Sequence, residues 1–341
     1  MLDTLLRRYD LCSKVCIIFV IVRKVILDPL SDVLSLLKPR NYMSAGFDAG
    51  GDWSIQFPDQ QKSIKTGAIV SGACWLSVEG VAEPVYLQTG DCFLLPSGRP
   101  FRMASHLSVP PVPAAEIFAA VSTGGMVTHK GGGDVCLVSS RFALAGHHAD
   151  MLLALLPPII HIQRDDDQAG LRWLVEHMVQ ELRDQRPGGF LVAQHLAHMM
   201  LVQALRLHLA EGAKGGIGWL FALADKQIGP VISAIHADPA RRWSLQKLAE
   251  QAGMSRSTFA LKFKETVGTS AIDYLTRWRI VLASDRLVNS DDPISVIAFS
   301  LGYASESAFS TAFKRLKGCS PRHYSRNQTA IIAAHPVTID S

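Results

Sequence analysis

The sequence lacks the features of secreted, membrane-spanning and disordered chains. Its 341 residues include six scattered cysteines without a Cys-x-x-Cys pair, which is too few for a disulfide-stapled fold of this length. No apolar run reaches the roughly 18 residues of an ordinary membrane span. Charged residues make up 19% and hydrophobic residues 48% of the chain, as in ordinary globular proteins. These observations indicate a globular protein of the reducing cytoplasm, long enough for two or three domains.

An apolar segment near the N-terminus does not fit a secretory signal. Val15 to Val22 is wholly apolar and lies between Lys14 and Arg23-Lys24. A signal peptide has a longer apolar region followed by a small-residue cleavage site, and Arg23-Lys24 occupies that place. Residues 1–27 are interpreted as an appendage without a role, as an extra strand or helix, or as a segment that touches a membrane. A start of translation at Leu27 is a further interpretation.

Basic residues are concentrated in the C-terminal third. Between Ile217 and Asn327 there are 15 Lys and Arg against 9 Asp and Glu, whereas the remainder has 19 against 21. The formal charge of +4 for the whole chain hides this division. Such asymmetry suggests a polyanion-binding part joined to a part with another task.

The chain before that basic third changes from strand-like to helical patterning. Asp28-Pro29 predicts the cap and first residue of a short helix that ends at Pro39. Across residues 53–142, short apolar runs alternate with Gly and Pro, as in a β-sandwich or barrel. Two helices follow, separated by Pro187-Gly188-Gly189, and such a pair often forms a dimer surface. A glycine-rich linker at 211–218 comes next.

The basic third contains one helical pattern twice. Ser244 precedes a short helix that ends at Gly253, and Ser255 then caps a second helix. A helix, a Gly turn and a Ser-capped helix form the helix-turn-helix pattern. The pattern recurs fifty residues later, with Gly302 at the turn and Ser305 at the cap.

A long helix predicted from Ala271 to Val288 joins the two copies and carries Arg277 and Arg279. Aligning Phe259 with Phe309 also aligns Phe263 with Phe313, so both copies are expected to bury the same aromatic pair. A rigid helix between two recognition helices can place them in successive major grooves, about one DNA turn apart. A single helix-turn-helix pattern often has only a structural role, but two such patterns in the basic third of the chain predict DNA binding.

The outward faces of the two recognition helices supply the candidate DNA contacts. Residues near each helix N-terminus would meet base edges, and basic residues farther along would lie nearer phosphates. The first helix presents Arg256, Ser257, Ala260, Leu261 and Lys264. The second presents Glu306, Ser307, Ser310, Thr311, Lys314 and Arg315.

This part of the chain resembles the AraC/XylS transcription regulators. The matching strings are WSLQKLAEQAGMSRSTFALKFKETVG, AIDYLTRWRIVLASDRL and PISVIAFSLGYASESAFSTAFKRLKGCSPRHYSR. The resemblance implies that two helices read double-stranded DNA and that transcription is activated through contact with RNA polymerase. Thr311 stands where many relatives have a larger basic or polar side chain, which implies thinner direct readout by the second helix.

Three candidate residues have alternative roles. Ala260 and Leu261 cannot donate hydrogen bonds from their side chains, but they can touch a thymine methyl group. Glu306 can accept a hydrogen bond from a cytosine amine, or it can stabilise the N-terminus of its own helix.

The N-terminal half resembles the cupin-type sensor domain found in one branch of these regulators, over roughly residues 28–215. Gly90 to Gly98 fits the cupin motif G-x5-P-x-G, and DPLSDVLSLLKPR and GACWLSVEG carry the rest of the resemblance. Metal-dependent cupins have a His ligand soon after P-x-G, and this chain has Phe101 at that position. They also have His and Glu ligands on an earlier strand, and residues 64–70 of this chain include no His. We therefore expect no metal site and no other cofactor.

Two kinds of signal are considered for this sensor. Trp53, Trp75 and Phe93 are candidates to line a pocket for a small organic effector inside the barrel, although such aromatics are more often core residues. Cys74, Cys92 and Cys136 lie in predicted strands and are candidates for redox sensing, which requires a lowered thiol pKa and exposure. A small organic effector is favoured.

The expected fold class is α+β, with an N-terminal cupin-like β-barrel, a helical pair and a C-terminal all-α double helix-turn-helix. We expect a sensor and dimerisation domain at 28–215, a DNA-binding domain at 216–327 and a tail at 328–341. We expect a cytoplasmic, homodimeric transcription activator without enzymatic activity. Its expected partners are double-stranded DNA, RNA polymerase and a small-molecule effector, and it is not expected to bind a membrane. The alternatives are a cupin metalloenzyme fused to a DNA-binding module and a membrane-associated regulator that uses residues 1–27.

Overall fold

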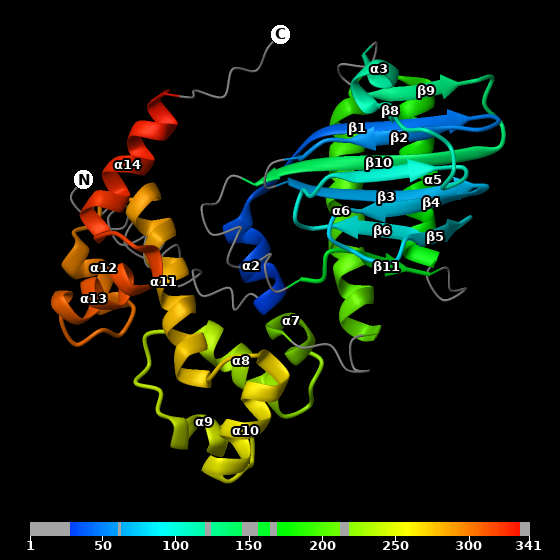
Figure 1. Cartoon of the computed structure of the whole chain (residues 1–341). Coiled ribbons are helices and arrows are strands. Elements are labelled where there is room, and N and C mark those ends of the chain that lie inside the picture. Colours follow the sequence, from blue (N-terminus) through cyan, green and yellow to red (C-terminus); the bar gives the residue numbers. More distant parts are fainter. Residues whose placement is uncertain are drawn as a thin grey trace, which may run out of the picture.

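A β-rich N-terminal half and a helical C-terminal half make up the molecule (Figure 1). The computed structural model describes residues 28–60, 63–119, 124–144, 156–163, 169–211 and 218–334. The predictions made for residues 1–27 therefore lie outside the described residues. The arrangement confirms the expected α+β class, with the helical pair between the strands and the C-terminal helices.

Two sheets build the N-terminal half. Within the described ranges, one has six strands in the order β11-β6-β3-β10-β1-β9, and the other has five in the order β5-β4-β7-β2-β8. Neighbouring strands are antiparallel except for β1 with β9 and β2 with β8, which are parallel. The strands span Pro39–Ala49 (β1), Ser54–Phe57 (β2), Ser63–Ser71 (β3), Ala73–Val78 (β4), Val85–Gln88 (β5), Cys92–Leu95 (β6), Phe101–Ala104 (β7), Val112–Pro113 (β8), Gly125–His129 (β9), Val135–Leu144 (β10) and Ile160–Ile162 (β11).

An aromatic core fills the space between the two sheets. Side chains alternate between the two faces of a strand, so β4 directs Cys74 and Leu76 inward. Trp53, Phe93 and Phe101 belong to the same buried cluster. Burial of each of these side chains removes roughly 150–250 Å² of surface from water, which stabilises the contact between the sheets.

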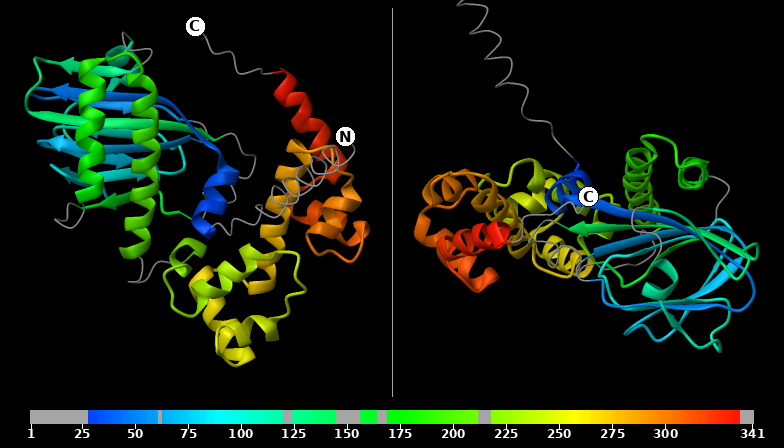
Figure 2. Two further views of the ribbon diagram at one scale, coloured as in Figure 1. Left: turned by 180° about the vertical axis from the view of Figure 1, so that it is seen from behind. Right: turned by 90° about the horizontal axis from the view of Figure 1, so that it is seen from above.

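Two helices, α5 (Ala169–Asp184) and α6 (Gly189–Glu211), lie side by side across the outer face of the six-stranded sheet (Figure 2). Their apolar sides pack with β10 in a second buried cluster. The chain reverses between them at Gly188, whose φ of +81° suits a residue without a Cβ. The predicted helical pair is thereby confirmed. A short helix, α3 (Ala114–Phe118), lies near β8.

Helix α2 (Pro29–Leu37) lies between the two halves (Figure 1). Its predicted cap is present, because the Ser31 N–H donates to Asp28 Oδ1 over 3.0 Å. Its buried residues, such as Val33 and Leu37, extend the second cluster from the sheet to α8 (Ile228–Ala237). Lys38 forms an ion pair with Asp285 at 3.2 Å. The β-rich half and the helical half therefore share one apolar core.

The C-terminal helices form two groups at the two ends of α11 (Figure 1). Their bounds are Trp219–Ala222 (α7), Ile228–Ala237 (α8), Leu245–Gln251 (α9), Arg256–Val267 (α10), Ala271–Asn289 (α11), Ile294–Ser300 (α12), Glu306–Lys317 (α13) and Pro321–Ala334 (α14). Within the described ranges, no helix combines the length and apolar character needed to cross a membrane.

Candidate nucleic-acid interface

Helices α9 and α10 form the first helix-turn-helix unit. The Lys247 N–H donates to Ser244 Oγ over 3.2 Å, and the Thr258 N–H donates to Ser255 Oγ over 3.2 Å. Both serines therefore satisfy backbone donors that a helix N-terminus leaves without partners. Gly253 makes the turn between the helices with a φ of +64°, a conformation that favours glycine.

Each unit is held by a pair of phenylalanine rings. Phe259 and Phe263 in α10 are fully buried, with ring centroids 5.5 Å apart. Phe309 and Phe313 in α13 repeat this arrangement at 5.6 Å. The expected alignment of the two aromatic pairs is confirmed, and it leaves the opposite face of each helix outward.

The outward face of α10 carries the predicted residues. Arg256, Ser257 and Lys264 are exposed, Leu261 is 62% exposed, and Ala260 is half-buried. Within the part of the chain that the structure describes, no carboxylate pairs with Arg256 or Lys264. Binding of a phosphate or a base by these two side chains therefore breaks no existing ion pair.

The outward face of α13 carries the predicted residues of the second unit. Ser307, Thr311 and Lys314 are exposed, whereas Glu306 and Ser310 are half-buried. The Thr311 hydroxyl donates to the Ser307 carbonyl over 3.0 Å, so part of its hydrogen-bonding capacity is used inside the helix. Weaker direct readout by the second helix stays a prediction.

Asp273, in the first turn of α11, connects that helix to α13. Its carboxylate accepts hydrogen bonds from Arg277 Nε at 2.6 Å and Thr269 Oγ1 at 2.9 Å, and it lies 3.9 Å from Arg315 Nη2. Burial raises the pKa of Asp273, but the hydrogen bonds and the two arginines outweigh burial and lower it. The carboxylate therefore stays charged at neutral pH and attracts Arg315, a predicted DNA contact, toward α11.

A contact between the two units was not foreseen from the sequence. Arg279 of α11 donates from Nε to the Pro239 carbonyl over 2.7 Å, and its guanidinium lies 5.6 Å from the centre of the Tyr303 ring. A Cβ on Gly302 would lie 2.1 Å from the Ala240 carbonyl oxygen. Gly302 therefore permits a close approach between the loop before α9 and the turn after α12. Arg279 joins the two units, a role that its basic character alone did not reveal.

The prediction that Trp53, Trp75 and Phe93 together line an effector pocket inside the sandwich is wrong. Trp53 and Phe93 are 1% exposed and belong to the closed core between the sheets. Trp75 lies on the other face of β4, with its ring centroid 4.8 Å from that of Tyr86. The error arises because strand neighbours alternate in direction, and the sequence alone did not show which face of β4 points inward.

The three candidate redox cysteines are all buried free thiols. Burial raises the pKa of Cys74 and of Cys92 to about 12, and the Asp91 carboxylate adds to the effect at Cys92. Burial also raises the pKa of Cys136, with partial opposition from Arg183. All three thiols are therefore protonated at neutral pH, whereas reactive cysteines have a lowered pKa and are exposed.

The position of the missing cupin histidine is filled by core packing. Phe101 is buried and stacks on Phe57 with ring centroids 4.3 Å apart. Among the residues that the structure describes, no group of three or more His, Cys, Asp or Glu side chains could hold a metal ion.

Comparisons with known proteins match both halves of the chain. A family model described as a cupin matches residues 28–210, and one described as a helix-turn-helix domain matches residues 248–327. An AraC-like transcription regulator of Streptomyces antibioticus is 42% identical over 303 residues, which is 88% of this chain and 99% of that protein. Its counterpart in Streptomyces lividans is 41% identical over 305 residues, covering 89% of this chain and 99% of that protein. The solved DNA-binding domain of AdpA, in complex with a target DNA, is 26% identical with a TM-score of 0.31, covering 33% of this chain and 99% of that domain.

Proposed function

The chain belongs to the AraC-like transcription regulators, and from that premise we propose that α10 and α13 enter successive major grooves of one double-stranded DNA site. The observation that carries this proposal is the presence of two Ser-capped helices, each with an exposed basic residue on its outward face, in the groups at the two ends of α11. The contact of Gly302 with Ala240 supports it, because it restricts how the two helices can move relative to each other.

The residues on the two outward faces have distinct proposed roles. The base edges are read by Arg256, Ser257, Glu306, Ser307, Ser310 and Thr311, by analogy with the N-terminal parts of other recognition helices. Ala260 and Leu261 contact thymine methyl groups. Lys264, Lys314 and Arg315 neutralise phosphates and set the register of the protein on the duplex.

Replacing Arg256 and Lys264 by alanine should have different effects on DNA binding. Arg256→Ala should weaken binding to the preferred site by about 1–3 kcal/mol and reduce preference at one base position. Lys264→Ala should weaken binding to all sequences alike and lower the salt slope by about one. The measurement is affinity for a selected site and for a scrambled site at several salt concentrations. Arg206→Ala, on helix α6, is the matched control and should change neither the affinity for the two DNAs nor the salt slope.

Equal loss on both DNAs from Arg256→Ala would show that Arg256 contacts phosphate rather than a base. Unchanged binding in both α10 variants would show that another face of α10 meets the DNA. The preferred DNA site is identified by sequencing the genomic fragments that the protein retains at about 150 mM salt. Two half-sites about one helical turn apart are the expected outcome.

The sensor half is proposed to convert a chemical signal into a change at the DNA. Residues 28–215 form the sensor and residues 216–327 the DNA-binding domain, and a small organic effector is favoured over cysteine oxidation because the three buried thiols have raised pKa values. The bound regulator activates transcription in the cytoplasm through contact with RNA polymerase. An effector can act in this way only if it binds the active and inactive arrangements with different affinity.

A homodimer formed through α5 and α6 is the proposed assembly. These helices expose several large apolar side chains, namely Trp173, Phe190, Leu191, Val192 and Met199. An exposed group of this kind is typical of a protein–protein contact. The second copy is the proposed occupant because the commonest oligomers are two-fold symmetric homodimers, in which the same patch of both chains meets.

Leu191→Asp should shift the protein from dimer to monomer, because it places a charge in the apolar contact. Leu191 is 59% exposed in the single chain, so the change should leave the fold intact. We expect the dimer dissociation constant to rise by at least about thirtyfold, as for truncation of a strong interface residue. Sedimentation equilibrium measures it, with Leu261→Asp on α10 as a control of similar exposure that should remain dimeric. Equal behaviour of the two variants would contradict this assembly.

A further inference from the structure

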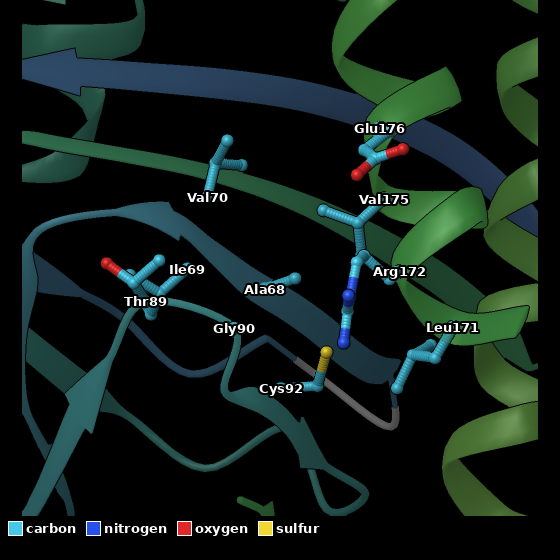
Figure 3. A pocket seen from close by; sticks show the side chains of 10 residues that line it. All are labelled: Ala68, Ile69, Val70, Thr89, Gly90, Cys92, Leu171, Arg172, Val175 and Glu176. Atoms are coloured by element: carbon cyan, nitrogen blue, oxygen red, sulfur yellow. The ribbon is translucent and has the colours of Figure 1, made fainter. Parts of the chain in front are cut away.

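A cavity of about 270 Å³ lies outside the sandwich core, between the six-stranded sheet and the beginning of α5 (Figure 3). Ala68 and Val70 of β3 and Cys92 of β6 line one side, and Leu171 and Val175 of α5 line the other. At about 30 Å³ for each water in the liquid, this volume corresponds to roughly nine waters. The cavity can therefore hold a small organic molecule, and it is separate from the core that contains Trp53 and Phe93.

Small residues keep the cavity open. Ala68 pairs with Cys92 across β3 and β6, and opposed residues of an antiparallel pair point to the same face, here toward α5. Gly90 continues the wall at the turn before β6 and has no side chain to fill the space. A longer side chain at any of these three positions would occupy the volume.

One cationic side chain reaches into this apolar space. Figure 3 shows Arg172 extending from α5 toward Cys92, with the Glu176 carboxylate farther along α5, beside Val175. The Cys92 thiol brings no negative charge, because burial raises its pKa to about 12. Arg172 also has an interaction within the chain, but a guanidinium has five N–H donors and can hold a ligand in addition.

We propose that this cavity binds a small amphipathic monocarboxylate, with its carboxylate on the Arg172 guanidinium and its apolar body against Ala68, Val70 and Val175. The planar guanidinium matches a carboxylate through two parallel hydrogen bonds. Glu176 at the rim repels a second negative charge and so disfavours dicarboxylates. The inference deepens the proposed function, because it rests on the role of the N-terminal half as an effector sensor.

The position of the cavity also explains how binding would reach the DNA-binding helices. Ala68, Cys92 and Leu171 belong to the buried cluster that continues through α6 to Trp219 and α8. A ligand bound between β3 and α5 favours arrangements in which α5 lies farther from the sheet. Because α5 packs on α6, the preferred arrangement of the helical pair changes with it.

The test uses the full-length protein without DNA, titrated with sodium hexanoate in a calorimeter. We expect saturable binding to one site per chain, and weaker binding of the uncharged hexanol and of butanedioate. Arg172→Gln should weaken hexanoate binding at least about tenfold, because a charged hydrogen bond is lost. Arg172 is exposed, so this variant should fold normally, and Val175→Phe should abolish binding by filling the cavity.

The matched control is Arg186→Gln. Arg186 lines a different cavity, of about 420 Å³, at the other end of the helical pair with Glu181 and Phe190, and its replacement should leave hexanoate binding unchanged. The proposal is overturned if hexanoate fails to bind at millimolar concentration, if Arg172→Gln binds it as the parent does, or if Arg186→Gln alone loses it. Selection of DNA sites is measured separately, so failure of the DNA-binding proposal is distinguishable from failure of this one.

Discussion

Replacing Phe313 by alanine is expected to unfold the second helix-turn-helix unit while the sensor half stays folded. Phe313 is fully buried, and its ring packs edge-on against Phe309 and Tyr324 at 5.6 and 5.3 Å between centroids. Among the residues whose side chains are described, its cluster has nine buried members and is separate from the large cluster that joins the β-rich half to the first unit. Loss of a buried Phe side chain costs about 3–5 kcal/mol, which a core this small cannot absorb.

Hydrogen exchange measured by mass spectrometry tests this expectation directly. The amides of α12 and α13 should lose protection, whereas those of β3 and β10 should keep it. Specific DNA binding should fall to the level of one recognition helix, since α13 no longer presents its outward face.

Phe263→Ala is the matched comparison in the first unit. Phe263 is equally buried, but it belongs to the cluster that continues through α8 and α2 into the sensor. Its removal should therefore increase exchange across α2 and α8 as well as α10. A uniform rise in exchange over the whole chain in Phe313→Ala would show that the second unit does not unfold independently.

Replacing His236 by alanine is expected to lower the free energy of unfolding by about 3 kcal/mol. The side chain is 1% exposed, and its ring stacks on Trp278 with centroids 3.8 Å apart. Its Nδ1 lies 3.3 Å from Asp32 Oδ2 and its Nε2 lies 2.8 Å from Tyr274 Oη. The loss combines ring packing with a Tyr274 hydroxyl left buried without a partner. Urea unfolding followed by tryptophan fluorescence measures it.

The same histidine should make stability depend on pH. Burial lowers the pKa of His236, and the nearby Asp32 carboxylate opposes this only in part. The unfolded chain, with the ordinary value of 6.5, therefore binds a proton more readily than the folded chain does. The contribution of neutral His236 is fully present above the unfolded value and is lost as the pH falls below it.

Unfolding curves between about pH 7.5 and 5.5 should show this loss in the parent protein and a smaller one in His236→Ala. His195→Ala, an exposed histidine on α6, is the control and should keep the dependence of the parent. A parent protein that becomes more stable on acidification across this range would contradict a neutral, buried His236. Because Asp32 lies in α2 and His236 in α8, the measurement also reports on the contact between the two halves of the molecule.

Features that depend on neighbouring residues could be predicted from the amino-acid sequence. Ser244, Ser255 and Ser305 cap helices through backbone groups three positions away, and Gly253 and Gly302 end helices through their own φ. Such signals lie within one helical turn, so the repeat of the two units and the helix between them could be predicted. The helical pair followed in the same way from its period of apolar residues.

Features that join residues far apart in the chain could be seen only in the folded structure. Whether Trp75 faces inward depends on how β4 lies in its sheet, and the residues around Arg172 come from two strands and a helix about a hundred positions apart. The bond between Asp32 and His236 joins residues 204 positions apart, and Arg279 meets the Pro239 carbonyl across 40 positions. Local patterns specify helices and turns because their hydrogen bonds are short in sequence. The cavity, the contact between the halves and the joint between the two DNA-binding units arise only when distant segments pack together.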